Sequence, residues 1–157
     1  MTSATLGKKV PAFAAPATGG TTFQLKDALK DGKAVVVYFY PKDNTSGCTK
    51  EGVAFGELYA QFVKAGALVL GVSPDSLASH EKFKAKYAFP FLLLADEEQS
   101  LCRLFDVWKE KSMYGKKYMG VERSTFLIDA KGILRHEWRK VKVDGHAAEV
   151  LAALKAL

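Results

Sequence analysis

The hydrophobic pattern divides the first half of the chain into two apolar runs with an amphipathic segment between them. Residues 34–40 (AVVVYFY) and 68–73 (LVLGVS) are short and continuously apolar, which is typical of strands buried on both faces of a sheet. Between them, apolar residues recur at helical spacing: Phe55, Leu58, Tyr59 and Phe62. This spacing predicts a helix over residues 49–65 that ends at Gly66. A strand, a helix and a strand in this order predict a right-handed βαβ unit.

Further elements alternate towards the C-terminus. Residues 76–87 are charged and helical in character, residues 91–95 (FLLLA) form another apolar run, and Asp96 is placed to cap a short helix. Residues 124–129 and 133–139 flank a turn that contains glycine, which predicts an antiparallel hairpin. A last apolar stripe predicts a C-terminal helix: Val150, Leu151, Leu154 and Leu157.

This order of elements predicts an α/β fold with a thioredoxin-like layout, in which helices flank both faces of a central mixed β-sheet. Residues 11–23, which are rich in Ala, Thr and Gly, receive no assignment. The chain has 157 residues, is 48% hydrophobic and shows no linker-like change in composition. These properties predict one compact domain over residues 1–157.

Charge and hydropathy argue against two classes of partner. The formal net charge is +6, but the 23 Lys and Arg are interspersed with 17 Asp and Glu, which favours solubility over a nucleic-acid-binding face. The clearest basic cluster contains Lys109, Lys111, Lys116 and Lys117 with Tyr114 and Tyr118. Such a cluster could grip phosphates and stack bases, but we interpret it as a solvated, mobile rim loop. No apolar run reaches the roughly 18 residues that suggest a membrane span.

Cysteine usage limits the possible chemistry. Residues 1–10 lack the apolar run of a signal peptide, so we expect a reducing, cytoplasmic location. Cys48 and Cys102 are too few for a disulfide framework and, with three dispersed histidines, too few for a structural zinc site. We therefore expect no metal ion and no cofactor. Any cysteine chemistry must be catalytic or incidental.

The segment 40–51 leaves the C-terminal end of a predicted strand and opens a helix, where ligand sites of open α/β sheets gather. With Thr45 as the N-cap, Cys48 is the third helical residue, where backbone N–H groups are unpaired and the helix dipole is positive. These surroundings favour a thiolate. The same N–H groups could hold an oxygen atom that gains negative charge.

Two residues before Cys48 could assist such chemistry. Pro41 lacks an N–H and has a fixed φ, so it can stiffen the turn and shield the sulfur without adding a donor. Thr45 can orient a substrate through a hydrogen bond. Taken singly, each residue has an ordinary interpretation: a proline that ends a strand, a threonine cap, and a buried small cysteine. Their combination at this spacing is far more specific.

The spacing of these three residues matches a family signature. Pro41, Thr45 and Cys48 fit the pattern P-x-x-x-T-x-x-C of peroxiredoxins, and the chain resembles the bacterioferritin comigratory protein, or peroxiredoxin Q, branch. Four segments carry the resemblance: FYPKDNTSGCTKEG at 39–52, GVSPDS at 71–76, KSMYGKKYMG at 111–120 and ERSTFLID at 122–129. The resemblance implies a thioredoxin fold in which Cys48 is the peroxidatic cysteine, which a peroxide oxidises to a sulfenic acid.

The same resemblance implies roles for two charged residues. Arg123 is then the arginine that reaches the thiolate and the peroxide across the site. A guanidinium suits this role because it stays charged and presents several N–H donors in a fixed fork. Outside the ERSTFLID context, an exposed cation at a strand edge would be the simpler interpretation. Glu51 either positions neighbouring groups or is an ordinary acid in the first turn of a helix, and the sequence favours neither.

Departures from the family pattern concern the step that follows oxidation. Many members carry proline at the position of Ser46, so the turn here is expected to be less rigid. The family's second, resolving cysteine lies at the positions of Val53 or Lys84, and neither residue can form a disulfide. We interpret Cys102 as a structural core residue rather than a resolving one. We therefore expect a one-cysteine cycle, in which thioredoxin, glutaredoxin or glutathione reduces the sulfenic acid of Cys48. The resemblance to this branch also implies a monomer.

Two other classes of function were weighed against a peroxidase. A thioredoxin-type oxidoreductase requires a C-x-x-C pair, and Cys48 is followed by Thr49, Lys50 and Glu51, which excludes it. A non-catalytic binding or chaperone module with the same fold remains the alternative, because a fold alone does not guarantee activity. We expect no specific binding of nucleic acid and no association with a membrane.

Overall fold

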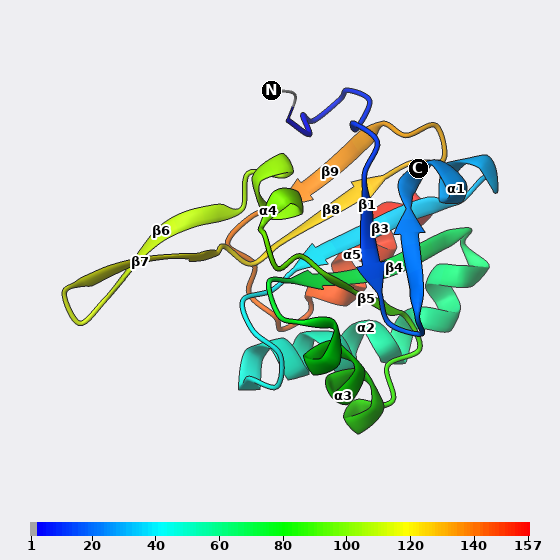
Figure 1. The fold of residues 1–157 in the computed structure, drawn as a ribbon. Helices are drawn as coiled ribbons and strands as arrows, with labels where there is room; N and C mark the ends of the chain where they lie inside the picture. Colours follow the sequence, from blue (N-terminus) through cyan, green and yellow to red (C-terminus); the bar gives the residue numbers. More distant parts are fainter. Residues whose placement is uncertain (1–2) are drawn as a thin grey trace.

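The computed structural model describes residues 3–157, which form nine strands and five helices (Figure 1). The strands are β1 Ala14–Ala17, β2 Thr21–Gln24, β3 Ala34–Phe39, β4 Ala67–Ser73, β5 Leu92–Ala95, β6 Trp108–Met113, β7 Lys116–Val121, β8 Ser124–Ile128 and β9 Leu134–Trp138. The helices are α1 Leu25–Lys30, α2 Ser46–Lys64, α3 Leu77–Tyr87, α4 Ser100–Leu104 and α5 His146–Lys155. None of these described helices is long and apolar enough to cross a membrane.

Seven strands form one mixed sheet in the order β2-β1-β5-β4-β3-β8-β9. Strands β3, β4 and β5 are parallel, whereas β8 pairs antiparallel with β3 and β9 with β8. Every residue of β3 is buried, as expected for an apolar run that lies inside a sheet covered on both faces. The predicted mixed sheet, its buried strands and the C-terminal hairpin are therefore confirmed.

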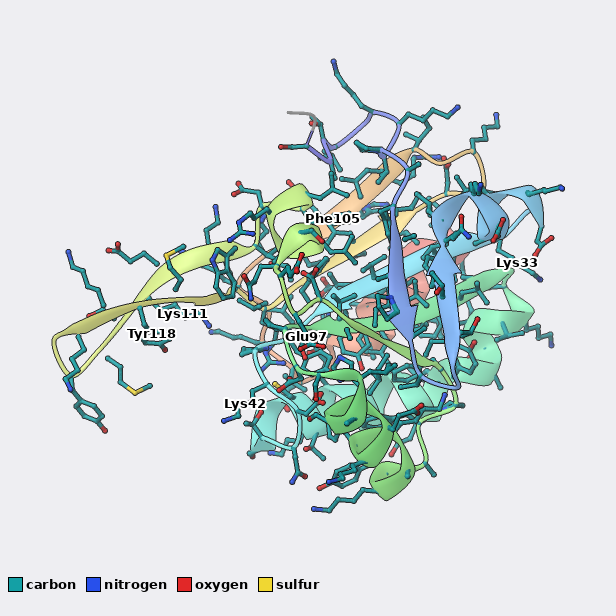
Figure 2. All side chains as sticks on the ribbon, viewed as in Figure 1. Lys33, Lys42, Glu97, Phe105, Lys111 and Tyr118 are labelled. Atoms are coloured by element: carbon teal, nitrogen blue, oxygen red, sulfur yellow. The ribbon has the colours of Figure 1, made fainter. Side chains whose placement is uncertain are left out.

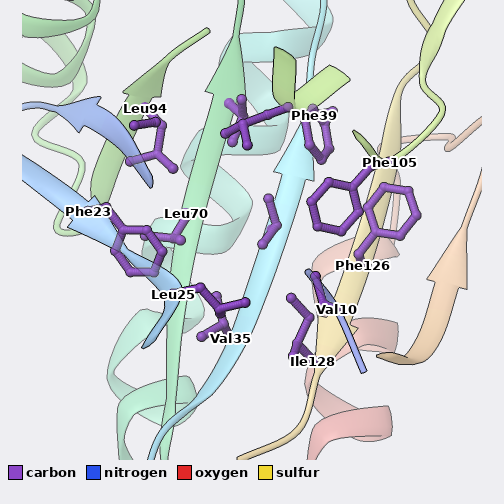
Figure 3. Packing of buried hydrophobic residues seen from close by; sticks show 14 of the residues in the cluster. Val10, Phe23, Leu25, Val35, Phe39, Leu70, Leu94, Phe105, Phe126 and Ile128 are labelled. Carbon is purple, nitrogen blue, oxygen red and sulfur yellow. The ribbon is translucent and has the colours of Figure 1, made fainter. Parts of the chain in front are cut away.

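Helices pack on both faces of this sheet, as the sequence predicts. One core layer places α1 and α4 against one face, and Figure 3 shows a part of it. Its members include Leu25, Val35, Phe39, Leu70, Cys102, Phe105 and Phe126. The other layer places α2, α3 and α5 against the opposite face. Its members include Tyr38, Cys48, Phe55, Phe62, Phe83, Phe91, Val150 and Leu154.

The structure differs from the sequence predictions in several places. Helix α1 was not predicted, and Leu157, expected on the C-terminal helix, lies beyond α5 and is exposed. Strands β1 and β2 occupy residues 14–24, where no element was assigned, and α2 begins three residues earlier than predicted. The expectation of a mobile rim loop at the basic cluster is wrong, because residues 108–121 form the antiparallel hairpin β6–β7. Its turn places Tyr114 and Gly115 at positive φ (52° and 77°), as tight hairpin turns require. Because polar residues lie on both faces of this hairpin, its sequence lacks the alternation of apolar and polar residues that predicts a strand.

Helix α2 approaches the chain that follows α3 closely at one glycine. A Cβ atom on Gly52 would lie 2.5 Å from Cζ of Phe89. The Phe89 ring is held in place, because it stacks on Phe91 with ring centroids 5.4 Å apart and meets Phe83 edge-on at 4.9 Å. One turn later, a Cβ atom on Gly56 would lie 3.4 Å from Cδ of Pro90, an ordinary contact. The two glycines of one helix thus differ in the space available.

Replacing each glycine by alanine tests this packing. Gly52→Ala is expected to lower the free energy of unfolding by about 1–3 kcal/mol, because the methyl group collides with a fixed ring. Gly56→Ala, the matched control, should raise it by up to about 1 kcal/mol through helix propensity. Urea denaturation of both variants measures the difference. Equal effects of the two replacements would contradict the close contact at Phe89.

Candidate active site

The start of α2 carries Cys48 and lies directly after β3. Half-buried Pro41 opens the connecting loop, and Thr45 is the N-cap, with an extended backbone (φ −94°, ψ 159°). Cys48 is the third residue of α2, so the predicted helix position is confirmed. The first backbone bond of the helix runs from Thr49 N–H to the Thr45 carbonyl (2.9 Å). The three N–H groups before it have no helical partner and point towards the start of the helix.

Strand pairing brings Arg123 to this helix. Strand β8 pairs antiparallel with β3, with Ser124 opposite Phe39, so the residue just before β8 lies beside the end of β3. Nη2 of Arg123 donates to Sγ of Cys48 at 3.3 Å, and Nη1 donates to Oε1 of Glu51 at 2.7 Å. Cys48 and Glu51 are three residues apart and share one side of α2. A single guanidinium therefore binds both the sulfur and the carboxylate.

Burial of this site shifts the pKa values of its charged groups. Glu51 and Cys48 are each only 1% exposed. Burial raises the pKa of Glu51 to about 7, although the charge of Arg123 acts in the opposite direction. Burial also acts to lower the pKa of Arg123, but the negative charges of Glu51 and Cys48 outweigh it and raise that pKa. The guanidinium consequently stays charged, whereas the carboxyl group of Glu51 takes up a proton near neutral pH.

Two buried polar atoms near this site have no hydrogen-bond partner within the described part of the chain. They are Oε2 of Glu51 and the hydroxyl of Tyr38 on β3. Burial raises the pKa of Tyr38 well above its usual value, and the charges of Glu51 and Cys48 raise it further. Tyr38 therefore keeps its proton and remains a potential donor beside the site.

A glycine permits the close approach of the guanidinium. A Cβ atom on Gly47 would lie 3.2 Å from Nη2 of Arg123, which is tighter than ordinary packing allows. The residue before Cys48 must therefore be small for Arg123 to reach the sulfur without displacement. No local sequence pattern predicts this role of Gly47, because the contact joins residues 76 positions apart.

Asp43 fixes the loop that precedes α2. Its carboxylate accepts hydrogen bonds from the hydroxyl of Tyr40 (2.6 Å) and the hydroxyl of Ser79 (2.8 Å), and it faces Nδ1 of His80 at 2.7 Å. Its backbone N–H donates to Asp75 at 2.8 Å. The loop is thus tied to α3 and to the end of β4. These positioning residues were missed because the partners are far apart in sequence and each looks ordinary alone.

Asp43, Asp75 and His80 place potential metal-ligand atoms within 4.8 Å of one another. Nε2 of His80 lies 2.8 Å from the carbonyl of Leu94, which can only accept, so this nitrogen carries a proton. Nδ1 is engaged by Asp43, and Asp75 accepts from the Ser73 hydroxyl and the Asp43 backbone. The group is better described as a hydrogen-bond network than as a metal site.

Thr45 is exposed, and its side chain does not cap the helix. Its hydroxyl donates to the carbonyl of Lys42 at 2.8 Å instead. The oxygen therefore keeps lone pairs that can accept a hydrogen bond from a molecule next to the helix start. The structure thus brings Arg123 into direct contact with both Cys48 and Glu51, and it places Thr45 and Pro41 in the loop that leads to them.

Known proteins share both the sequence and this fold. The AhpC/TSA family matches residues 6–137. Peroxiredoxin Bcp of Xanthomonas campestris pv. campestris is 52% identical over 158 residues, which cover 99% of this chain and 98% of that protein. Peroxiredoxin Bcp of Bacillus subtilis is 51% identical over 150 residues, with 96% and 94% covered. The structure of Xanthomonas campestris peroxiredoxin Q superposes with a TM-score of 0.87 at 53% identity, covering 92% of this chain and 90% of that one.

The chain belongs to the AhpC/TSA family of peroxiredoxins. The resemblance to the bacterioferritin comigratory protein, or peroxiredoxin Q, branch is confirmed, and so is the thioredoxin-like fold. This peroxiredoxin is a thiol-dependent peroxidase, an enzyme that uses a peroxide substrate and a thiol reductant. The non-catalytic module considered as an alternative is disfavoured accordingly.

The second cysteine of the peroxiredoxin lies away from this site. Cys48 belongs to the core layer formed with α2, and Cys102 to the layer formed with α4 on the opposite face of the sheet. Both cysteines are free thiols. Burial and the neighbouring carboxylate of Asp96 raise the pKa of Cys102, which keeps this thiol protonated and inert. Val53 is exposed on α2, and Lys84 donates to the carbonyl of Phe91 at 2.8 Å.

Glu51→Gln tests the buried carboxylate. The pKa of Glu51 is about 7 in the folded protein against an ordinary value of 4.5, so the folded state binds this proton more tightly than the unfolded chain. Its contribution to stability is fully present below about pH 4.5 and is lost as the pH rises through about 7. The free energy of unfolding of the wild type, relative to that of Glu51→Gln, should fall across this window. Urea titrations at several pH values measure it; a difference independent of pH would argue against the raised pKa.

Proposed function

We propose that Cys48 is the peroxidatic residue of this peroxiredoxin and that it reduces hydrogen peroxide and organic hydroperoxides. The observation that carries the proposal is the contact between Nη2 of Arg123 and Sγ of Cys48, at the start of a helix with unpaired N–H groups. The Xanthomonas campestris bacterioferritin comigratory protein has a described alkyl peroxide reduction activity, which supports this class of substrate. The reacting sulfur lies on helix α2, and its cation comes from a distant segment that only the folded chain brings to it.

The proposed reaction begins with the thiolate of Cys48. The sulfur attacks the terminal oxygen of the hydroperoxide, the S–O bond forms and the O–O bond breaks. The leaving oxygen takes a proton from water and departs as an alcohol, or as water when the substrate is hydrogen peroxide. Sulfur loses two electrons and becomes a sulfenic acid, while the peroxide gains them. Arg123 and the free N–H groups of α2 stabilise the negative charge that passes from sulfur to oxygen.

Three further residues have supporting roles in this proposal. The hydroxyl of Thr45, with its proton directed to Lys42, accepts the O–H of the peroxide and aligns its O–O bond with the sulfur. Pro41 adds no N–H that would compete for the thiolate. Glu51 holds Nη1 of Arg123 and so leaves Nη2 directed at the sulfur. It is therefore a positioning residue.

Regeneration then requires an external thiol. The sulfenic acid of Cys48 reacts with a thiol to give a mixed disulfide and water, and a second thiol releases Cys48 as the reduced sulfur with formation of the reductant's disulfide. Cys102 lies across the sheet, and Val53 and Lys84 offer no sulfur, which supports a one-cysteine cycle. Thioredoxin, glutaredoxin and glutathione are the candidate reductants. Without them, further oxidation to a sulfinic acid would inactivate the enzyme.

We also propose that the enzyme acts as a monomer in the cytoplasm and folds as one unit over residues 1–157. Two buried free thiols and the need for a thiol reductant are in keeping with a reducing compartment. Sedimentation velocity of the reduced protein tests the monomer, and cell fractionation tests the compartment.

The two cysteines should differ completely in activity. Cys48→Ser is expected to abolish peroxide consumption with dithiothreitol as reductant, because the nucleophile is lost, whereas Cys102→Ser should retain it. Intact-mass analysis after one equivalent of hydrogen peroxide should show oxygen added to Cys48. A loss of two hydrogens that maps to a disulfide between the cysteines would refute the one-cysteine cycle.

Arg123→Gln removes the charge beside the sulfur but keeps a side chain of similar length. Loss of one such preorganised donor typically slows catalysis by about 100-fold to 1,000-fold, and we expect a decrease of this order in the rate constant for peroxide. Arg135→Gln, on the exposed strand β9, is the control and should react as the wild type does. Stopped-flow measurement of Cys48 oxidation distinguishes them; similar rates for both variants would rule out the proposed role of Arg123.

A further inference from the structure

The hairpin β6–β7 stands apart from the rest of the protein. It forms a separate two-stranded sheet and projects from the body of the molecule (Figure 1). A two-stranded ribbon is marginally stable alone, and this one packs against the core only near its base, where Val121 is buried. Four of the eight exposed large hydrophobic residues in the described chain lie on it: Met113, Tyr114, Tyr118 and Met119. Such a concentration is typical of an interaction surface.

The register of the hairpin separates its residues into two faces. The basic face comprises Lys109, Lys111, Met113, Lys116, Tyr118 and Gly120. The opposite face comprises Trp108, Glu110, Ser112, Lys117, Met119 and Val121. Contacts support this division, because a Cβ atom on Gly120 would lie 3.3 Å from Cδ of Lys111 and 3.5 Å from Cε2 of Tyr118. The lysine stem and the tyrosine ring therefore lie side by side.

The two faces differ in charge. The basic face carries three lysines and no acid. Lys109 pairs with Asp106 outside the hairpin at 3.0 Å, whereas within residues 3–157 neither Lys111 nor Lys116 forms an ion pair. On the opposite face Lys117 lies 3.8 Å from Glu110, so its charge is offset. A second copy of this chain would place lysines against lysines in a symmetric dimer of this face, which is repulsive. The charge complement of the basic face is an acidic surface.

The basic face lies on the same side as the candidate active site. Figure 2 shows Lys111 and Tyr118 on the side of the hairpin towards the loop that contains Lys42. Arg123 follows β7 after a single intervening residue. Burial and the charge of Arg123 lower the pKa of Lys111, while the charge of Cys48 acts to raise it, so Lys111 lies within electrostatic range of the sulfur. The opposite face instead continues into the core layer of α4 through Val121 and Trp108.

We propose that the basic face of the hairpin docks an acidic protein whose thiol reduces oxidised Cys48. This inference rests on the function proposed above. Cys48 is 1% exposed, so a protein thiol must be held against the site while the sulfur becomes accessible. Docking on an adjacent surface holds the partner near the site and so raises the effective concentration of its thiol at Cys48. Small neutral thiols need no such surface, and the exposed apolar members Met113 and Tyr118 suit contact with a macromolecular partner.

The docked reaction balances with a dithiol partner. One partner thiol attacks the Cys48 sulfenic acid, forming an intermolecular disulfide and releasing water. The second partner thiol attacks that disulfide, which returns Cys48 to its reduced state and leaves an intramolecular disulfide on the partner. The partner's dithiol supplies both electrons.

Adjacent residues of β7 provide a matched pair of variants. Lys116→Glu with Tyr118→Ser alters the basic face, whereas Lys117→Glu with Met119→Ser makes the same charge change on the opposite face. Both sets are exposed, so neither removes core packing. The probes are hydrogen peroxide as oxidant and, as reductant, either an acidic bacterial thioredoxin or dithiothreitol. The measured quantity is the ratio of kcat/KM with thioredoxin to that with dithiothreitol.

We expect this ratio to fall about tenfold in the basic-face variant, with a smaller deficit at high salt, and to match the wild type in the opposite-face variant. Among the single replacements, Lys116→Glu should also lower this ratio and Lys117→Glu should leave it unchanged. If both variants consume peroxide and have equal thioredoxin-to-dithiothreitol ratios, the docking surface is refuted while the proposed function of Cys48 stands. Loss of an oligonucleotide or anionic-vesicle interaction with no change in the ratio would overturn the choice of partner. A wild type that consumes no peroxide with dithiothreitol would instead overturn the function of Cys48.

Discussion

The chemistry proposed for this peroxiredoxin depends on one guanidinium that contacts two acidic groups. Arg123 contacts the sulfur of Cys48 and the carboxylate of Glu51 in surroundings from which water is largely excluded. Burial raises the pKa of Glu51, and the positive charge of Arg123 opposes this rise without cancelling it. The guanidinium itself is held more firmly in its charged form. Arg123 thereby keeps its positive charge beside the sulfur, while Glu51 gains or loses a proton as the pH changes near neutrality.

Distant parts of the chain build this contact. The pairing of β3 with β8 carries Arg123 to the helix start, and the small Gly47 leaves room for it. Asp43 ties the intervening loop to α3 through Ser79 and His80. The precision of the site therefore comes from the sheet and from a buried hydrogen-bond network, since the loop alone contains few constraints.

Local sequence patterns predicted most strands and helices and the helical position of Cys48. They did not predict contacts between residues that are distant in the sequence. Apolar periodicity predicted β3, β4 and α2, and cap position predicted Cys48 as the third helical residue. The nearness of Arg123 followed only from resemblance, because it depends on pairing across about eighty residues. For Glu51 the sequence left two roles open, and its burial against Arg123 now favours the positioning role. The hairpin β6–β7 was predicted to be a loop because strands are usually recognised by alternating apolar residues, and lysines occupy many of these positions here.

The position of the sheet between the two sulfur atoms has a consequence for the cell. Within the described chain, Cys48 and Cys102 lie in separate core layers, so the proposed one-cysteine cycle has no second thiol of the same molecule to reduce the oxidised sulfur. In that proposed cycle, an oxidised molecule must wait for an encounter with its electron donor. Throughput at high peroxide is then governed by the supply of that donor rather than by the speed of the attack, and the fraction of oxidised molecules reports how well the supply keeps pace.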